Sequence, residues 1–426
     1  MAVADADSAA GRAAGQNVLW VLVSTPVTGI GTYVLLVVTA RAIGPEAFGD
    51  FGVFWAVTII CGLGVFLPLE QETTRRGSGR AAASIAGLWK RAMKVAFIAA
   101  VVCAGLAFAT WPLYAPLIDF GAGLVAAFAI SVLGNFLQFP SRGVLASLRR
   151  FRDYGLVVAL DAVARAVAAI VLAGLGAHSA TSYALAVGLS AFGSGLVAVV
   201  LARRAIKRGA PAGTAATAER FGRDGMRLVL AAGAMQTILN SGTIVAKVVA
   251  PAAQSALAGQ LTATLTLARL PVLVVQSIQS TYLSRLAARW HAHDVVAVRA
   301  LLRLIAAAVL VVTAGLVIGA ATIGPWVMSV VFGTSYVTDR TTVVLVALGV
   351  GIYLIASVST DAGIALGLHT MIVAAWLAAV PVAVLMVMLA PSMVTAATLP
   401  LIGGALVAAA VLARPLMKRA AAQVDR

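Results

Sequence analysis

The chain has 426 residues, of which 62% are hydrophobic and only 11% are charged. This composition lies outside the range of soluble globular proteins and excludes that class. The formal net charge is +16, from 31 Lys and Arg residues against 15 Asp and Glu residues. We do not expect this charge to bind nucleic acid, because it is spread over many short connections and is not gathered on one folded surface.

Apolar segments long enough to cross a bilayer follow one another along the whole sequence. A crossing takes about 20 residues in a helix. The pattern therefore predicts an all-α, polytopic membrane protein with about twelve transmembrane helices. The predicted spans cover residues 17–40, 48–69, 92–112, 118–139, 155–176, 181–201, 226–249, 256–280, 300–323, 341–366, 369–390 and 395–413.

The basic residues alternate between the two sides of the predicted membrane. Except for Arg41, Arg165, Lys247, Arg269 and Arg340, every Lys and Arg lies in the N-terminal segment, in an even-numbered connection or in the C-terminal tail. Lys and Arg near the ends of spans mark the cytoplasmic side. We therefore predict that both termini are cytoplasmic and that the basic connections attract anionic membrane lipids.

The longest polar interruption divides the predicted spans into two sets of six. An even number of spans returns the chain to the same side of the membrane, so the two sets are expected to run in parallel about an axis along the membrane normal. The predicted domains are a polar cytoplasmic N-terminus (1–16), an N-terminal six-helix bundle (17–201), a cytoplasmic linker (202–225), a C-terminal six-helix bundle (226–413) and a cytoplasmic tail (414–426).

Charged residues inside the spans are the first candidates for a functional site. An ionisable group near the bilayer centre costs about 2.5–3.5 kcal/mol on insertion scales, so it normally faces a partner or a wet cavity. Asp161 and Arg165 lie four residues apart on one helical face, and they either pair with each other or line a cavity. Arg269 has no carboxylate at that distance, so its partner is another helix, water or a substrate anion. Asp361 is equally isolated and could pair with Arg269, with Arg165 or with a transported proton.

Neutral polar residues could line the same cavity or could join helices to one another. They are Asn135, Gln138, Gln236, Asn240 and Ser241. Arg41 and Lys247, which precede a proline at the outer ends of the first and seventh spans, complete the candidate substrate-binding residues. The sequence assembles no pattern of catalytic residues or metal ligands, so we expect a protein that is not an enzyme and that needs no metal or cofactor.

The segment between the first two spans, ARAIGPEAFGDFGVF, resembles the Arg-x-Leu-Gly-Pro-Glu-x-(Phe/Tyr)-Gly segment of polysaccharide-biosynthesis flippases of the Wzx type. Gly44-Pro45-Glu46 and Phe48-Gly49 carry this resemblance. Residues 141–155 are similar to the connection after the fourth helix of that family, and residues 237–287 to its second copy of the segment, with Ala250-Pro251-Ala252 in place of Gly-Pro-Glu. The family belongs to the multidrug/oligosaccharidyl-lipid/polysaccharide (MOP) superfamily.

The resemblance implies two MATE-like six-helix bundles around a central cavity that opens alternately to each side. The cargo would be a polyprenyl-diphosphate-linked oligosaccharide, flipped across a bacterial cytoplasmic membrane for cell-surface polysaccharide synthesis. Polysaccharide assembly proteins would be partners. A buried arginine such as Arg269 suits a diphosphate, because the planar guanidinium can hold two oxygens at once.

Two other classes of protein stay open. A MATE-like antiporter of cations or drugs would share the fold and would need acidic cavity residues, for which Asp161 and Asp361 are available. An integral-membrane glycosyltransferase or polymerase would need an acidic or His-bearing outer loop. The short outer connections offer little beyond Asp119 and Asp339 for that chemistry.

Overall fold

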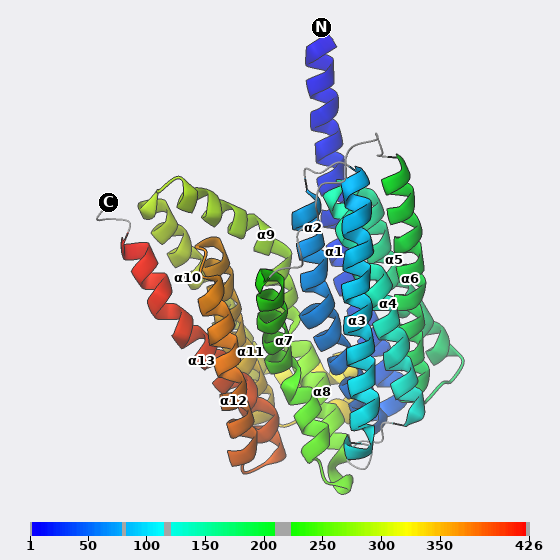
Figure 1. The fold of residues 1–426 in the computed structure, drawn as a ribbon. Helices are drawn as coiled ribbons and strands as arrows, with labels where there is room; N and C mark the ends of the chain where they lie inside the picture. Colours follow the sequence, from blue (N-terminus) through cyan, green and yellow to red (C-terminus); the bar gives the residue numbers. More distant parts are fainter. Residues whose placement is uncertain (1, 79–81, 115–120, 209–222, 423–426) are drawn as a thin grey trace. The chain divides into compact units, whose positions relative to one another are not determined.

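The computed structural model describes residues 2–78, 82–114, 121–208 and 223–422, and all regular elements in these ranges are helices (Figure 1). In chain order they are α1 (Ala2–Cys61), the π-helix η1 (Gly62–Phe66), α2 (Leu67–Gly77), α3 (Ala82–Tyr114), α4 (Ala122–Ser147), α5 (Phe151–Gly174), α6 (Ala180–Arg208), α7 (Arg223–Val249), the 3-10 helix η2 (Ala252–Gln254), α8 (Ser255–Ala268), α9 (Leu270–His291), α10 (Val295–Phe332), the 3-10 helix η3 (Thr334–Tyr336), α11 (Arg340–Ala365), α12 (His369–Leu389) and α13 (Met393–Ala422). Within the described residues, 11 helical segments are long and apolar enough to cross a membrane. The predicted fold class, an all-α multi-pass membrane protein, is therefore confirmed.

The first two predicted spans are joined in the structure. They lie in one helical segment, Ser24–Gly77, of 54 residues, although about 20 residues are enough for one crossing. Gly44 divides this segment, because its φ of 76° and ψ of 170° are not helical. Glycine adopts positive φ without the penalty that a β-carbon brings, and Pro45 has the fixed φ that suits the first turn of the next helix. The joined segment is therefore helical on each side of a break at Gly44.

The chain groups into two compact units, which we call the first unit (residues 1–42 and 61–226) and the second unit (residues 43–60 and 227–426). The sequence assigned residues 43–60 to the N-terminal bundle, whereas their contacts group them with the C-terminal helices. This segment begins at the break near Gly44 and ends at the π-helix η1, so the helix is irregular at both of its ends. Most of the predicted linker, residues 209–222, lies outside the described residues.

Helix α4 is the centre of the first unit, where it packs against α2, α3, α5 and α6. It meets α6 through small residues. A β-carbon added to Gly134 would lie 2.5 Å from the backbone of Ala191, and one added to Gly188 would lie 2.8 Å from the Ala127 carbonyl oxygen. Small residues let membrane helices approach closely enough for dispersion contacts to hold them together. The polar side chains of α4 are thereby kept in fixed positions.

Helix α11 is the centre of the second unit, where it packs against α8, α9, α10, α12 and α13. Tyr353 and Trp376 are fully buried in this core. Trp376 Nε1 donates a hydrogen bond of 2.9 Å to Thr360 Oγ1. The indole N–H is therefore satisfied away from water, as a buried tryptophan requires.

Aromatic and backbone contacts are among those that pack the segment of residues 43–60 into the second unit. The ring of Phe48 meets that of Tyr336 edge to face, with centroids 5.9 Å apart. Close by in the sequence, the carbonyl of Pro45 approaches α8 at Gly259 so closely that a β-carbon there would lie 1.6 Å from the oxygen. No residue larger than glycine fits at position 259 without a backbone shift.

We expect Gly259→Ala to destabilise the protein. The backbones at Pro45 and Gly259 would have to separate, and overpacking of this kind costs about 1–3 kcal/mol, occasionally more. Gly319→Ala on α10 is the matched control, because a β-carbon there meets nothing within 4 Å. Thermal unfolding of the detergent-purified protein, read by size-exclusion fluorescence, should show a lower midpoint for Gly259→Ala only. Equal midpoints for the two variants would contradict the close contact.

Candidate functional site

A row of buried polar side chains, which we call the α7 stripe, follows one face of α7. It consists of Gln236, Asn240, Thr243 and Lys247. Their spacing of three or four residues is that of a single helical face. Asn240 Nδ2 donates hydrogen bonds to the backbone oxygen of Gln236 at 2.9 Å and to its Oε1 at 3.3 Å. Two of the candidate residues predicted from the sequence, Gln236 and Asn240, are thus in contact.

The predicted span 256–280 is broken at Arg269. Helix α8 ends at Ala268 and α9 begins at Leu270. Pro271, in the first turn of α9, has no backbone N–H and its ring collides with a preceding turn of helix, so a continuous helix is disfavoured here. The first two N–H groups of α9 after Pro271 donate to the Arg269 carbonyl oxygen, at 3.0 and 3.4 Å. Arg269 therefore lies at the junction where the carbonyl end of α8 meets the amide end of α9.

The guanidinium of Arg269 contacts the α7 stripe. Nη1 donates to Asn240 Oδ1 at 3.0 Å, and Nη2 donates to the Leu239 carbonyl oxygen at 2.6 Å and to Thr243 Oγ1 at 3.5 Å. These acceptors are an amide, a backbone carbonyl and a hydroxyl. All three of these acceptors are neutral, and together they orient the guanidinium.

Lys247, at the other end of the α7 stripe, forms an ion pair. Its Nζ lies 2.9 Å from Asp50 Oδ1, and both side chains are buried. The pair joins α7 to the segment of residues 43–60. Removal of one partner would leave a buried charge without compensation, which is costly. Sequence reasoning did not identify Asp50, because the two residues are almost two hundred positions apart and no local pattern connects them.

Asp361, on α11, is buried and receives hydrogen bonds from two residues of α9, Gln279 and Tyr282. Burial, and after it the nearby Asp361 carboxylate, raises the pKa of the Tyr282 phenol well above its ordinary value. The phenol is therefore neutral at physiological pH and serves as a donor. The sequence leaves Arg269, Arg165 and a transported proton open as partners of Asp361, whereas the structure places two donors of α9 there.

Asp161 and Arg165, in the first unit, form the local pair that their spacing allowed. Arg165 Nη2 donates to Asp161 Oδ2 at 2.5 Å, and about an eighth of each side chain is exposed (12% and 14%). The two side chains lie one turn apart on α5, so the pair forms within a single helix.

The pair predicts a rescue by double mutation. Asp161→Asn and Arg165→Gln, made singly, should each lower the amount of folded protein, because each leaves a charge in a largely buried position. The double variant should recover most of that loss, since interacting residues are not additive. Immunoblots of membrane fractions measure this. Wild-type amounts of all three variants, together with lost transport, would instead favour a cavity role.

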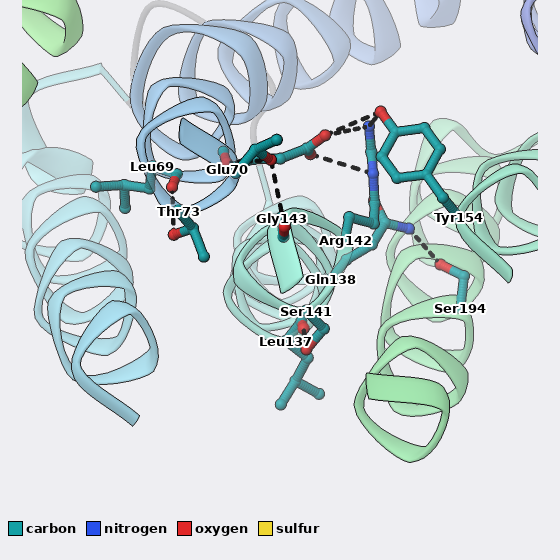
Figure 2. A network of polar contacts seen from close by, with 11 residues as sticks. Leu69, Glu70, Thr73, Leu137, Gln138, Ser141, Arg142, Gly143, Tyr154 and Ser194 are labelled. Atoms are coloured by element: carbon teal, nitrogen blue, oxygen red, sulfur yellow. Dashed lines mark hydrogen bonds and ion pairs between the residues drawn. The ribbon is translucent and has the colours of Figure 1, made fainter. Parts of the chain in front are cut away.

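A second polar network lies in the first unit, between α2, α4 and α5. Figure 2 shows Arg142 and Tyr154 converging on the carboxylate of Glu70. Arg142 Nε lies 3.1 Å from Glu70 Oε2, and Tyr154 Oη donates to Glu70 Oε1 at 2.9 Å. Arg142 also donates to Tyr154 Oη at 3.0 Å and to Gln138 Oε1 at 3.2 Å. Gln138 in turn donates to Ser194 Oγ of α6 at 2.7 Å.

Sequence reasoning missed this network because it assigned Arg142 to a cytoplasmic connection. The structure places Arg142 inside α4, with only 13% of its side chain exposed. The guanidinium also stacks over the Phe139 ring, 4.8 Å from its centroid. The separation of four residues between Gln138 and Arg142 was a helical signal in the sequence. Residue 70, on another helix, could not be found in this way.

The remaining predicted residues lie apart from these groups. Arg41 is exposed, and Asn135 is buried on α4. Ser241 donates to the Ile238 carbonyl oxygen at 2.8 Å within α7. Asp339 caps α11 by accepting from Thr342 N at 2.9 Å, and the Thr342 hydroxyl, which also donates to it, lowers the pKa of Asp339. Asp119 lies outside the described residues.

Sequence comparisons give a limited match. No family model matches the chain. Uncharacterized proteins of Mycobacterium bovis and Mycobacterium tuberculosis are 29% identical to it over 171 residues, which are 39% of this chain and 39% of each relative. The chain therefore matches only about two-fifths of the length of these curated relatives.

Solved structures match over nearly the whole chain. An inward-facing multidrug resistance MATE family transporter of the MOP superfamily has a TM-score of 0.70 at 14% identity, over 94% of this chain and 96% of that one. An outward-facing conformation of such a transporter has a TM-score of 0.60 at 14% identity, over 96% of each chain. A MOP superfamily transporter from Pyrococcus furiosus has a TM-score of 0.63 at 13% identity, over 96% of each chain. The protein thus has the fold of the MATE transporters of the MOP superfamily, which confirms the fold part of the resemblance read from the sequence.

Proposed function

We propose that this protein flips a polyprenyl-diphosphate-linked oligosaccharide across the membrane by alternating access, and that the Arg269 region binds the diphosphate. The observation that carries the proposal is the position of Arg269 at the break between α8 and α9. There the guanidinium is held by Asn240 and by the Leu239 carbonyl, where α8 ends and α9 begins. Helix N-termini favour anions, and broken membrane helices of transporters present such ends to anionic substrate groups.

The neighbouring residues supply partners for sugar. Gln236, Asn240 and Thr243 offer amide and hydroxyl groups on the face of α7 that Arg269 contacts. Sugar hydroxyl groups need donors and acceptors of this kind, while the polyprenyl chain can stay in the bilayer. A cationic group beside neutral polar groups is thus a chemically matched set for a diphosphate bearing an oligosaccharide.

The similar structures support a transport function by analogy of fold. They include transporters in both an inward-facing and an outward-facing conformation. The Pyrococcus furiosus protein is described as having a binding pocket of reverse polarity, which suggests a different function for that protein. Charge at the binding site is therefore the property by which we separate the candidate cargoes.

A cation or drug antiporter is the second candidate, and Asp361 is the observation that favours it. A basic side chain pairs with each of the carboxylates of Glu70, Asp50 and Asp161. The two hydrogen-bond donors to Asp361 named above are neutral. A buried carboxylate held by neutral donors could exchange a proton or a cation. A glycosyltransferase or polymerase has less support, since Asp339 serves as a helix cap and the fold is that of transporters.

Reconstitution into liposomes distinguishes the two candidates. A fluorescent polyprenyl-diphosphate oligosaccharide, quenched from outside by a membrane-impermeant reductant, should become accessible faster in vesicles that contain the protein. Efflux of ethidium that is driven by an imposed proton gradient should not be accelerated. Accelerated ethidium efflux with no effect on the labelled lipid would replace the flippase by the antiporter.

A further inference from the structure

A pocket of about 370 Å³ lies within the second unit, away from Arg269. Residues of α9, α10, α11 and α13 line it, and most of them are apolar, including Leu286, Leu302, Ile305, Val309 and Leu416. Its volume is within the range of small-molecule sites, about 300–1,000 Å³. A pocket of this size and polarity suits a hydrocarbon chain.

The charged residues of the pocket are basic. Arg299 and Arg303 line it from α10, four residues apart and therefore on the same face of that helix. Arg414 and Lys418, both exposed, are sequence neighbours of the lining residues that α13 contributes. Among the described residues that line the pocket there is no carboxylate. One end of the pocket therefore attracts a negative group.

The surface of α10 beside the pocket exposes apolar side chains, as a surface in contact with lipid does. On α10, Leu304, Leu310 and Val311 expose 65%, 57% and 71% of their surface, and Leu310 is also a lining residue. Exposed leucine and valine on a membrane helix are normal only where lipid covers them. A molecule can therefore enter the pocket directly from the bilayer.

We propose that this pocket binds one anionic phospholipid, with its phosphate at Arg299 and Arg303 and one acyl chain along the apolar wall towards Val309. An inorganic anion would leave that wall against water, and a zwitterionic lipid would bring its own cation towards the arginines. Basic pockets between membrane helices are known to select anionic headgroups. By the positive-inside rule the lipid belongs to the cytoplasmic leaflet. The inference is independent of the cargo proposed above.

The bound lipid would touch Tyr282, which contacts the buried carboxylate of Asp361. Tyr282 lines the pocket and donates its hydroxyl hydrogen to Asp361. Ala362, the next residue of α11, also lines the pocket. Occupancy therefore stabilises the contact between α9 and α11, so the lipid should raise the thermal stability of the protein as well as bind to it.

Native mass spectrometry of the detergent-purified full chain tests the proposal. The probes are dioleoyl-phosphatidylglycerol and dioleoyl-phosphatidylcholine, which share their acyl chains. We expect one phosphatidylglycerol to bind in preference to phosphatidylcholine and to raise the melting temperature. Arg299→Gln with Arg303→Gln should weaken phosphatidylglycerol binding about 30-fold, taking about tenfold per 1.4 kcal/mol and about 1 kcal/mol for each basic residue.

Two further variants make the test decisive. Lys90→Gln with Lys94→Gln removes two exposed positive charges at the same spacing on α3 and should leave the preference unchanged. Ala306→Phe keeps both arginines but fills the pocket, so it should abolish binding of the single tight lipid, and it preserves the test if the arginine variant does not fold. Equal binding of the two lipids would contradict the proposed site. An equal loss of phosphatidylglycerol binding in the α3 control variant would contradict it as well. Displacement of phosphatidylglycerol by a polyprenyl diphosphate at equal concentration would assign the pocket to the cargo's carrier lipid instead.

Discussion

Arg269→Ala should severely reduce flipping of the lipid-linked oligosaccharide while most of the protein still inserts and folds. The guanidinium is the charged group that we assign to the diphosphate, and truncation of one partner of a buried charge pair costs about 2–5 kcal/mol. The transport rate should therefore fall by roughly a hundredfold, at about tenfold per 1.4 kcal/mol. Arg269→Lys should keep only part of the wild-type transport rate, because an ammonium is a point charge and cannot hold two phosphate oxygens in a planar fork.

Two controls separate binding from structure. Arg340→Ala removes the same side chain from an exposed position at the start of α11, and it should transport normally. Asn240→Ala removes one acceptor of Arg269 but keeps the charge, so it should lower transport less than Arg269→Ala. The liposome assay and immunoblots of the same preparations give the two readouts. A normal flipping rate in Arg269→Ala would show that this residue has no part in the mechanism. A loss of protein in proportion to the loss of transport would show that its role is structural.

Arg142→Ala should have the largest effect on stability of any change discussed. It leaves the buried Glu70 carboxylate with the Tyr154 hydroxyl but without its guanidinium. Breaking a buried ion pair by removing one partner costs about 3–5 kcal/mol, which is a large part of the stability of a typical domain. We expect little folded protein in the membrane fraction, measured by size-exclusion fluorescence after detergent extraction.

The double variant Arg142→Met with Glu70→Leu tests whether the cause is the uncompensated charge. It should restore folding, because apolar residues of similar volume often replace a buried pair at no cost. Arg75→Ala is the matched control. Its side chain is 66% exposed, and its partner Glu72 also has an ion pair with Arg76, so the loss should be within about 1 kcal/mol. Full amounts of folded Arg142→Ala with lost transport would show that the network serves the transport cycle.

The breaks in the helices show where local sequence was sufficient. The break at Gly44 lies between the predicted spans 17–40 and 48–69, and local sequence explains it, because glycine tolerates positive φ and proline starts a helix well. Pro271 carried the same type of signal inside the predicted span 256–280, but the apolar residues around it hid the break. Hydropathy reports whether a segment can enter the bilayer, and it does not report whether the helix is continuous there.

The sequence by itself determined that the chain crosses the membrane many times as helices, and it predicted which connections are cytoplasmic. Insertion depends on the apolarity of about 20 consecutive residues and on the charges next to them, which are local properties. Only the tertiary structure decided that Arg269 contacts Asn240, that Lys247 pairs with Asp50 and that Arg142 pairs with Glu70. Each of these partners lies on a different helix. Which helices become neighbours depends on the fit of small residues and side chains over their whole length, and no short stretch of sequence contains that information.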